Sequence, residues 1–135
     1  AKLEPVKLSD YSGKTVVIAV YPSIDTGVCQ AQNRRFNAEA ANFKNLVVLS
    51  VSCDLPFAQR RFCAAEGLDH VITLSDHRDV DFGTKYGYLM QEVRLLARGT
   101  VIIDSRGIVQ YVEYVPEITQ EPDYEAALKH LKGSL

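Results

Sequence analysis

The chain has 135 residues and a mass of 15.0 kDa, the size of one domain, and we expect a single domain over residues 1–135. Its 47% hydrophobic and 24% charged residues suit a packed core and exclude a disordered tail. A net charge of −2 argues against a nucleic-acid partner, which usually meets a strongly basic surface. No apolar run reaches the ~18 residues of a membrane span, and residues 1–5 lack the apolar core of a signal peptide.

Strand and helix patterns alternate along the chain. Runs of β-branched and aliphatic residues predict strands, and spaced apolar residues bounded by proline or glycine predict helices. In the first half of the chain we expect a strand over 14–20, a helix over 29–43, a strand over 46–51 and a helix from Pro56 that stops at Gly67. A strand over 71–74 and a short helix over 79–86 follow. The chain then forms two strands, over 100–103 and 108–115, joined by a turn at 104–107, and ends in a helix over 124–132. This order requires crossover connections and predicts a mixed sheet with helices on both faces. It suits a thioredoxin-like α/β sandwich of three layers, and other three-layer α/β folds remain open on pattern alone.

The chain has three cysteines, Cys29, Cys53 and Cys63. An odd, small number does not form the disulfide framework of a secreted domain. There is no C-x-x-C pair, and the histidines lie apart from the cysteines, so no zinc site is expected. No metal, nucleotide or flavin site is suggested, and we expect no cofactor. The thiols are therefore either inert and buried or reactive.

Cys29 carries the most information. It follows a predicted strand and a polar, turn-rich loop over 21–27, and it lies where a helix begins. The unpaired N–H groups and the partial positive charge of a helix N-terminus favour a thiolate, which is the nucleophilic form of cysteine. A buried structural cysteine is the alternative. Residues 29–35 also fit the C-x5-R pattern of a phosphatase loop, but no glycine lies between Cys29 and Arg35 to let the backbone curl around a phosphate.

The loop before Cys29 resembles the P-x-x-x-T-x-x-C loop of the peroxiredoxins, and its sequence Pro-Ser-Ile-Asp-Thr-Gly-Val-Cys resembles the bacterial thiol peroxidases, the atypical two-cysteine peroxiredoxins. The resemblance covers nearly the whole chain. It continues in blocks over 54–63, 71–75, 96–98, 117–119 and 122–128. The family pattern places a β-hairpin and a further strand ahead of the segment at which this chain begins.

The resemblance implies roles for four residues in peroxide reduction. Cys29 is the expected peroxidatic cysteine, which attacks the peroxide O–O bond and becomes a sulfenic acid. Thr26 is expected to hydrogen-bond the peroxide and the thiolate, and Pro22 to shield the site from water. Arg98 is expected to supply the positive charge that stabilises the thiolate. An arginine side chain keeps this charge near neutral pH.

The resemblance also implies that Cys63, 34 positions after Cys29, is the resolving cysteine that forms an intramolecular disulfide with Cys29. Because the two cysteines lie on different predicted helices, we expect both helices to unwind locally before the bond forms. Cys53 does not match the family's third cysteine, whose position is occupied here by Ser50. We interpret Cys53 as a packing residue, with a rival resolving role left open.

The implied activity is reduction of hydrogen peroxide and organic hydroperoxides, with thioredoxin as the reductant. Analogy with the family also implies the bacterial cytoplasm and a homodimer, with neither nucleic acid nor membrane as a partner. Two other functions remain open from the residues themselves. One is a thiol–disulfide oxidoreductase or redox sensor without fast peroxide reduction, against which the absence of C-x-x-C counts. The other is a thioredoxin-like binding module without catalysis.

Overall fold

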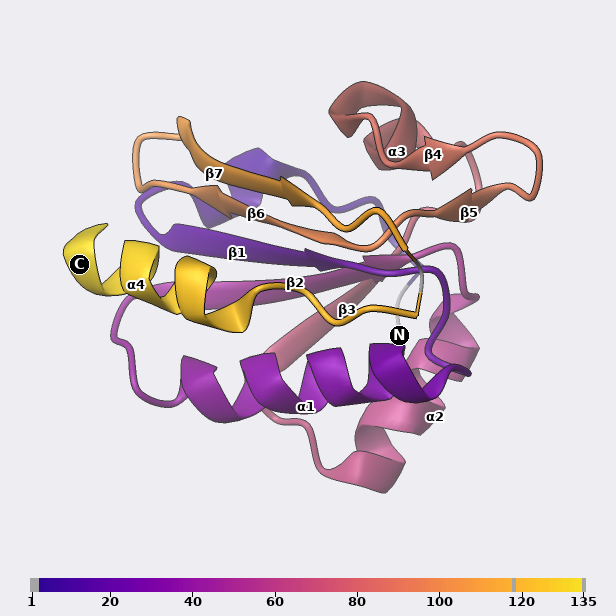
Figure 1. Cartoon of the computed structure of the whole chain (residues 1–135), viewed down its shortest axis with the longest axis horizontal. Helices are drawn as coiled ribbons and strands as arrows, with labels where there is room; N and C mark the ends of the chain where they lie inside the picture. Colours follow the sequence, from indigo (N-terminus) through magenta and orange to yellow (C-terminus); the bar gives the residue numbers. More distant parts are fainter. Residues whose placement is uncertain (1–2, 118, 135) are drawn as a thin grey trace.

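The computed structural model describes residues 3–117 and 119–134, the last without its side chain. Ala1, Lys2 and Ile118, which contribute to the expectations on the N-terminus and on the 117–119 block, lie outside the described residues. A five-stranded sheet forms the centre of the molecule, in the strand order β3-β2-β1-β6-β7 (Figure 1). The parallel strands are β1 (Thr15–Val20), β2 (Leu46–Ser52) and β3 (Val71–Ser75), whereas β6 (Gly99–Ile103) and β7 (Val109–Tyr114) run antiparallel to their neighbours. The predicted mixed sheet is confirmed.

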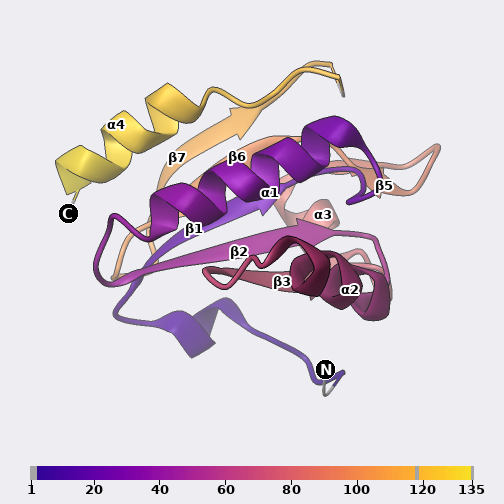
Figure 2. The ribbon, with the colours of Figure 1, turned by 90° about the horizontal axis from the view of Figure 1, so that it is seen from below.

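Helices cover both faces of this sheet, which confirms the predicted three-layer α/β sandwich. Helices α1 (Gly27–Ala40) and α4 (Tyr124–Ser134) lie on one side, and the N-terminal segment with a short 3-10 helix, η1 (Leu8–Tyr11), lies on the other (Figure 2). On the α1 and α4 side, β1 and β6 side chains pack against Ala127, Leu128 and Leu131 of α4, with Tyr124 beside them. Buried apolar side chains hold both layers to the sheet.

The second layer contains α3 (Asp81–Tyr86) and a small hairpin of β4 (Leu89–Met90) and β5 (Leu95–Leu96). These elements pack on Ile18, Leu49 and Val101 from the opposite face of the sheet. Neither η1 nor the β4–β5 hairpin was predicted. In the part of the chain that is described, no helix is long and apolar enough to cross a membrane.

Helix α2 (Pro56–Glu66) lies beside β3 and next to the N-terminal half of α1. It begins with a proline and ends at Gly67, whose φ of 64° is the left-handed conformation that glycine adopts without strain. This helix matches its prediction at both ends. Ala58 and Phe62 of α2 pack against a third small cluster, formed by Tyr21, Ile24 and Cys29.

The boundaries of three helices differ from those predicted, and α4 differs only in that it continues to Ser134 rather than 132. Helix α1 begins at Gly27, two residues before Cys29, because the Thr26 hydroxyl accepts the Cys29 N–H and caps the first turn. It ends at Ala40, and tighter i to i+3 bonds continue the chain to Phe43. Helix α3 begins at Asp81 rather than 79, because Val80 has a left-handed backbone and cannot continue a helix towards its N-terminus.

Candidate active site

The carboxyl end of β1 is where the predicted site residues meet. The chain leaves β1 at Val20, passes through the 21–26 loop and enters α1, which places Cys29 near that end of the sheet. Val20 is paired with Gly99, the first residue of the antiparallel strand β6. Arg98 directly precedes β6, so the pairing of β1 with β6 brings Arg98 and Cys29 together from opposite halves of the chain.

Arg98, the residue expected to place a positive charge beside the thiol, contacts Cys29 directly. Its Nη1 donates to Cys29 Sγ at 3.2 Å and to Gln32 Oε1 at 2.8 Å. Arg98 is 1% exposed, and Cys29 and Gln32 are completely buried. Because the site is buried, the interaction of the guanidinium with the sulfur atom is only weakly screened by water.

Gln32 fixes the position of the arginine. It lies three residues after Cys29 in α1, and its Nε2 donates to the carbonyl oxygens of Val20 and Gly99 at 3.2 and 3.4 Å. Its amide therefore joins the paired ends of β1 and β6 to the Arg98 guanidinium. Our sequence interpretation missed Gln32, although its place one helical turn after Cys29 was a usable signal.

Thr26 and Pro22 lie in the loop that leads into α1. The Thr26 hydroxyl accepts a hydrogen bond from Cys29 N at 3.2 Å, which caps the helix, and donates one to the Ser23 carbonyl oxygen at 3.4 Å. The Thr26 side chain is exposed. Pro22 is buried beside the end of β1. Both residues are therefore close to Cys29 along the chain, and Thr26 also contacts its backbone.

Asp54 holds this loop in place from the end of β2. Its carboxylate accepts from Ser23 Oγ and Ile24 N, both at 2.8 Å, and from Ser52 Oγ at 2.7 Å. Charge-assisted bonds of this kind are stronger than neutral ones. The residue fell inside a block that resembles the family, but no role was predicted for it.

A buried polar chain supports the first turn of α1. Asn33 Nδ2 donates to the Cys29 carbonyl oxygen at 2.9 Å, and Asn33 Oδ1 accepts from Ser50 Oγ, which also bonds the Tyr21 hydroxyl at 2.6 Å. Burial raises the pKa of Tyr21 to about 12, so its hydroxyl stays neutral. Complete pairing of these buried groups favours a single arrangement of the backbone around Cys29.

Cys63 and Cys53 lie in different surroundings. Ala58 and Phe62, and not Cys63, are the α2 side chains that pack with the cluster around Cys29, whereas Cys63 lies near Thr73 of β3. Burial raises the pKa of Cys63, which keeps it protonated at neutral pH, and burial does the same to Cys53. Cys53 packs against the core on the α3 side of the sheet, as expected of a packing residue. All three cysteines are free thiols.

Two other kinds of site receive no support from the geometry. Within the described ranges, no group of three or more His, Cys, Asp or Glu side chains could hold a metal ion. The C-x5-R pattern is continuous helix in α1, and Arg35 forms ion pairs with Glu39 and Glu125 rather than facing Cys29. A phosphate loop needs a curled backbone, which this helix excludes.

Comparisons with known proteins identify the class. The family model described as Redoxin matches residues 1–128. The thiol peroxidase of Oceanobacillus iheyensis is 58% identical over 124 residues, which are 92% of this chain and 76% of that protein. The thiol peroxidase of Staphylococcus aureus strain MRSA252 is 55% identical over 131 residues, 97% of this chain and 79% of that protein.

Solved structures agree with this class. A peroxiredoxin-like protein from Aquifex aeolicus has a TM-score of 0.86 at 40% identity and covers 92% of this chain and 74% of its own. Enterococcus faecalis AhpC has a TM-score of 0.80 at 21% identity, over 96% of this chain and 79% of its own, and shows the same fold. The chain belongs to the Redoxin family, with a thioredoxin-like fold. Its similarity to curated enzymes identifies its activity as that of a thiol-dependent peroxidase of the peroxiredoxin type.

Proposed function

We propose that Cys29 is the thiol that reduces hydroperoxides, in a single domain that extends over residues 1–135. The Cys29 thiolate attacks one oxygen of the peroxide ROOH, the O–O bond breaks, and the leaving alkoxide takes a proton to become ROH. Cys29 becomes a sulfenic acid. For hydrogen peroxide the second product is water.

The contact between Arg98 and Cys29 is the observation that carries this proposal. A buried guanidinium stabilises the thiolate before the reaction, and it can stabilise the negative charge that develops on the leaving oxygen. We propose that the Thr26 hydroxyl, which caps α1, turns to the peroxide when it enters, and that Pro22 keeps water away from the sulfur.

Cys63 completes the catalytic cycle in this proposal. Its thiol attacks the Cys29 sulfenic acid, so that a Cys29–Cys63 disulfide forms and water leaves. Thioredoxin then restores both thiols by dithiol exchange and is itself oxidised. Since Phe62 rather than Cys63 packs against the cluster around Cys29, we propose that the disulfide forms after local unwinding of α2.

The proposal also covers the partners and the cellular compartment of the protein, and it rests here on similarity to the same family. The curated relatives are bacterial proteins. We propose a bacterial cytoplasmic enzyme that works with thioredoxin and a small hydroperoxide and that assembles as a homodimer. Sedimentation of the reduced chain at micromolar concentration checks the assembly, and a monomer there would contradict it.

Peroxide consumption coupled to thioredoxin and its reductase tests the proposal. We expect consumption by the wild type, none by Cys29→Ser, and wild-type rates in Cys53→Ser, the matched control for loss of one thiol. Consumption by Cys29→Ser would overturn the assignment of Cys29. A folded wild type that consumes no peroxide with any thiol reductant would overturn the proposed cycle.

A further inference from the structure

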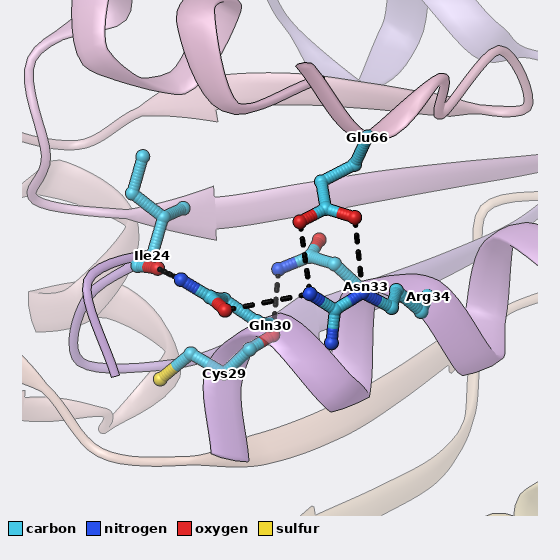
Figure 3. Close-up of polar contacts among 6 residues, drawn as sticks. All are labelled: Ile24, Cys29, Gln30, Asn33, Arg34 and Glu66. Carbon is cyan, nitrogen blue, oxygen red and sulfur yellow. Dashed lines mark hydrogen bonds and ion pairs between the residues drawn. The ribbon is translucent and has the colours of Figure 1, made fainter. Parts of the chain in front are cut away.

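The last turn of α2 is fastened to α1 by a two-pronged ion pair. The Arg34 guanidinium donates from Nη2 to Glu66 Oε1 at 2.8 Å and from Nε to Glu66 Oε2 at 3.2 Å (Figure 3). Arg34 lies five residues after Cys29 in α1, and Glu66 is the last residue of α2, three after Cys63. A bidentate arginine–carboxylate pair fixes orientation as well as distance.

A second contact holds the chain that follows α2. The backbone N–H of His70 donates to Asn37 Oδ1 at 2.8 Å. Asn37 lies three residues after Arg34, so both side chains project from the same face of α1. One face of α1 therefore holds Glu66 at the end of α2 and His70 just beyond it.

The same face is connected to the loop before Cys29. Arg34 Nη2 also donates to Gln30 Oε1 at 3.4 Å, and Gln30 Nε2 donates to the Ile24 carbonyl at 3.1 Å. Figure 3 shows these side chains in a row from Ile24 to Glu66, with the Cys29 sulfur pointing away from the row. The contacts thus join the active-site loop to the end of α2.

Cys63 lies near the last turn of α2, which the Arg34–Glu66 ion pair connects to α1. The N–H groups of Gly67 and Leu68 both bond the Cys63 carbonyl oxygen and close the helix. Helix ends are the part of a helix that opens first. Opening of this turn would free Cys63 to turn towards α1, and the contacts of Glu66 and His70 with α1 oppose that opening.

We propose that Arg34 and Asn37 form a latch on the last turn of α2, which positions Cys63 and limits the rate at which it reaches oxidised Cys29. This inference rests on the proposed function. The latch acts through the segment that carries Cys63 and does not touch the reacting atoms, so Arg34, Asn37 and Glu66 are positioning residues.

The latch decides between two fates of the Cys29 sulfenic acid. Attack by Cys63 gives the disulfide and water. Attack by the sulfenic acid sulfur on a second ROOH gives the sulfinic acid and ROH, which thioredoxin does not reverse. A closed latch lengthens the life of the sulfenic acid and favours the second fate, whereas a weakened latch favours the disulfide.

The experiment compares wild type with Arg34→Met and Glu66→Gln in the full chain. Reduced protein is mixed with hydrogen peroxide, quenched with an alkylating reagent and analysed by mass spectrometry for the Cys29–Cys63 disulfide and for the Cys29 sulfinic acid. We expect disulfide formation about two- to fivefold faster in each variant, the range for loss of one exposed ion pair. The peroxide concentration that gives half over-oxidation should rise by the same factor, with the rate of sulfenic acid formation unchanged.

Two controls separate the latch from general loosening of α1. Arg35→Met removes the neighbouring arginine, whose ion pairs join α1 to Glu39 and to Glu125 of α4, and it should leave both rates at wild-type values. The charge exchange Arg34→Glu with Glu66→Arg should restore the wild-type partition. Circular dichroism establishes that each variant is folded.

The outcomes distinguish this inference from the proposed function. If the disulfide forms in the wild type but neither Arg34→Met nor Glu66→Gln changes its rate, or if they slow it, the latch is wrong and the Cys63 assignment stands. An Arg35→Met effect equal to that of Arg34→Met also overturns the latch. If the wild type forms no Cys29–Cys63 disulfide, the assignment of Cys63 is wrong and the latch falls with it.

Discussion

The Arg98 guanidinium lies 3.2 Å from the Cys29 sulfur, although the two residues are 69 positions apart in the chain. The pairing of Val20 with Gly99 creates this contact, because each residue lies at the end of a strand that leads into the site. The proximity of a positive charge to Cys29 is therefore a consequence of how the sheet is paired.

Arg98→Met should slow the reaction of Cys29 with peroxide on the order of 100-fold, the usual cost of removing one preorganised electrostatic donor. Methionine keeps most of the buried volume but carries no charge. Stopped-flow mixing of reduced protein with hydrogen peroxide measures the rate. An unchanged rate across the neutral pH range would contradict the role of Arg98.

Gln32→Leu should reduce the same rate on the order of tenfold, because Arg98 loses the acceptor that orients it. Gln32→Glu keeps an acceptor for Arg98 and should lose less activity than Gln32→Leu. The rate of reaction with peroxide and the free energy of unfolding are measured for both variants, so that a loss of activity can be compared with a loss of stability. Equal rates in the two variants would show that Gln32 supports the fold rather than the position of Arg98.

Cys63→Ser should undergo one oxidation per chain but fail to turn over with thioredoxin. The Cys29 sulfenic acid then has no intramolecular partner and proceeds to the sulfinic acid with excess peroxide. Mass spectrometry of the intact chain follows both products. Normal thioredoxin-coupled turnover in this variant, lost when Cys53→Ser is added, would transfer the resolving role to Cys53.

Gly99→Ala should destabilise the protein by about 1–3 kcal/mol and lower its activity, because a Cβ at this position would overlap the Glu113 carbonyl oxygen and the Tyr88 ring. Urea unfolding measures the cost. Gly27→Ala is the control, since a Cβ at Gly27 in α1 meets no atom within 4 Å. A loss of stability in Gly27→Ala equal to that in Gly99→Ala would contradict the steric account.

Asp104→Asn should destabilise the protein at neutral pH, and the difference from wild type should shrink as the pH falls. The N–H of Ile108 and the side chains of Gln110 and Arg106 hold the pKa of Asp104 at about 2, below its ordinary 3.8. A lowered folded-state pKa stabilises the protein above the unfolded-state pKa and loses that effect as pH falls towards 2. Urea unfolding at pH 7, 5 and 3.5 tests this, and a constant difference would refute it.

Sequence patterns predicted the five strands of the sheet and helices α1 to α4 well, because strong local signals mark them. Pro56 and Gly67 bound α2 as expected, and the turn at 104–107 joins β6 to β7. The β4–β5 hairpin was missed because each of its strands has only two residues, too few to show alternation. Packing on the core, rather than local propensity, forms it.

Part of the site was predicted, because some of its residues are marked by their sequence context or by resemblance to a family. Cys29 is marked by its loop, and Arg98 was placed by resemblance to a family. The roles of Gln32 and Asp54 were missed, because a polar side chain in a helix or after a strand usually faces water, and the helical spacing of Gln32 from Cys29 is a weak signal against that expectation. Only the fold shows that Gln32 is buried and that Asp54 binds a loop 30 positions earlier in the chain.

The order in which the ribosome releases the chain gives the pairing of β1 with β6 a further consequence. Cys29 emerges well before Arg98, and the non-local contact between the strands must form before the two residues meet. During synthesis Cys29 therefore lacks the guanidinium beside its sulfur until Arg98 has been added. In the function proposed here, fast reaction with peroxide then waits until the second half of the chain has folded onto the first.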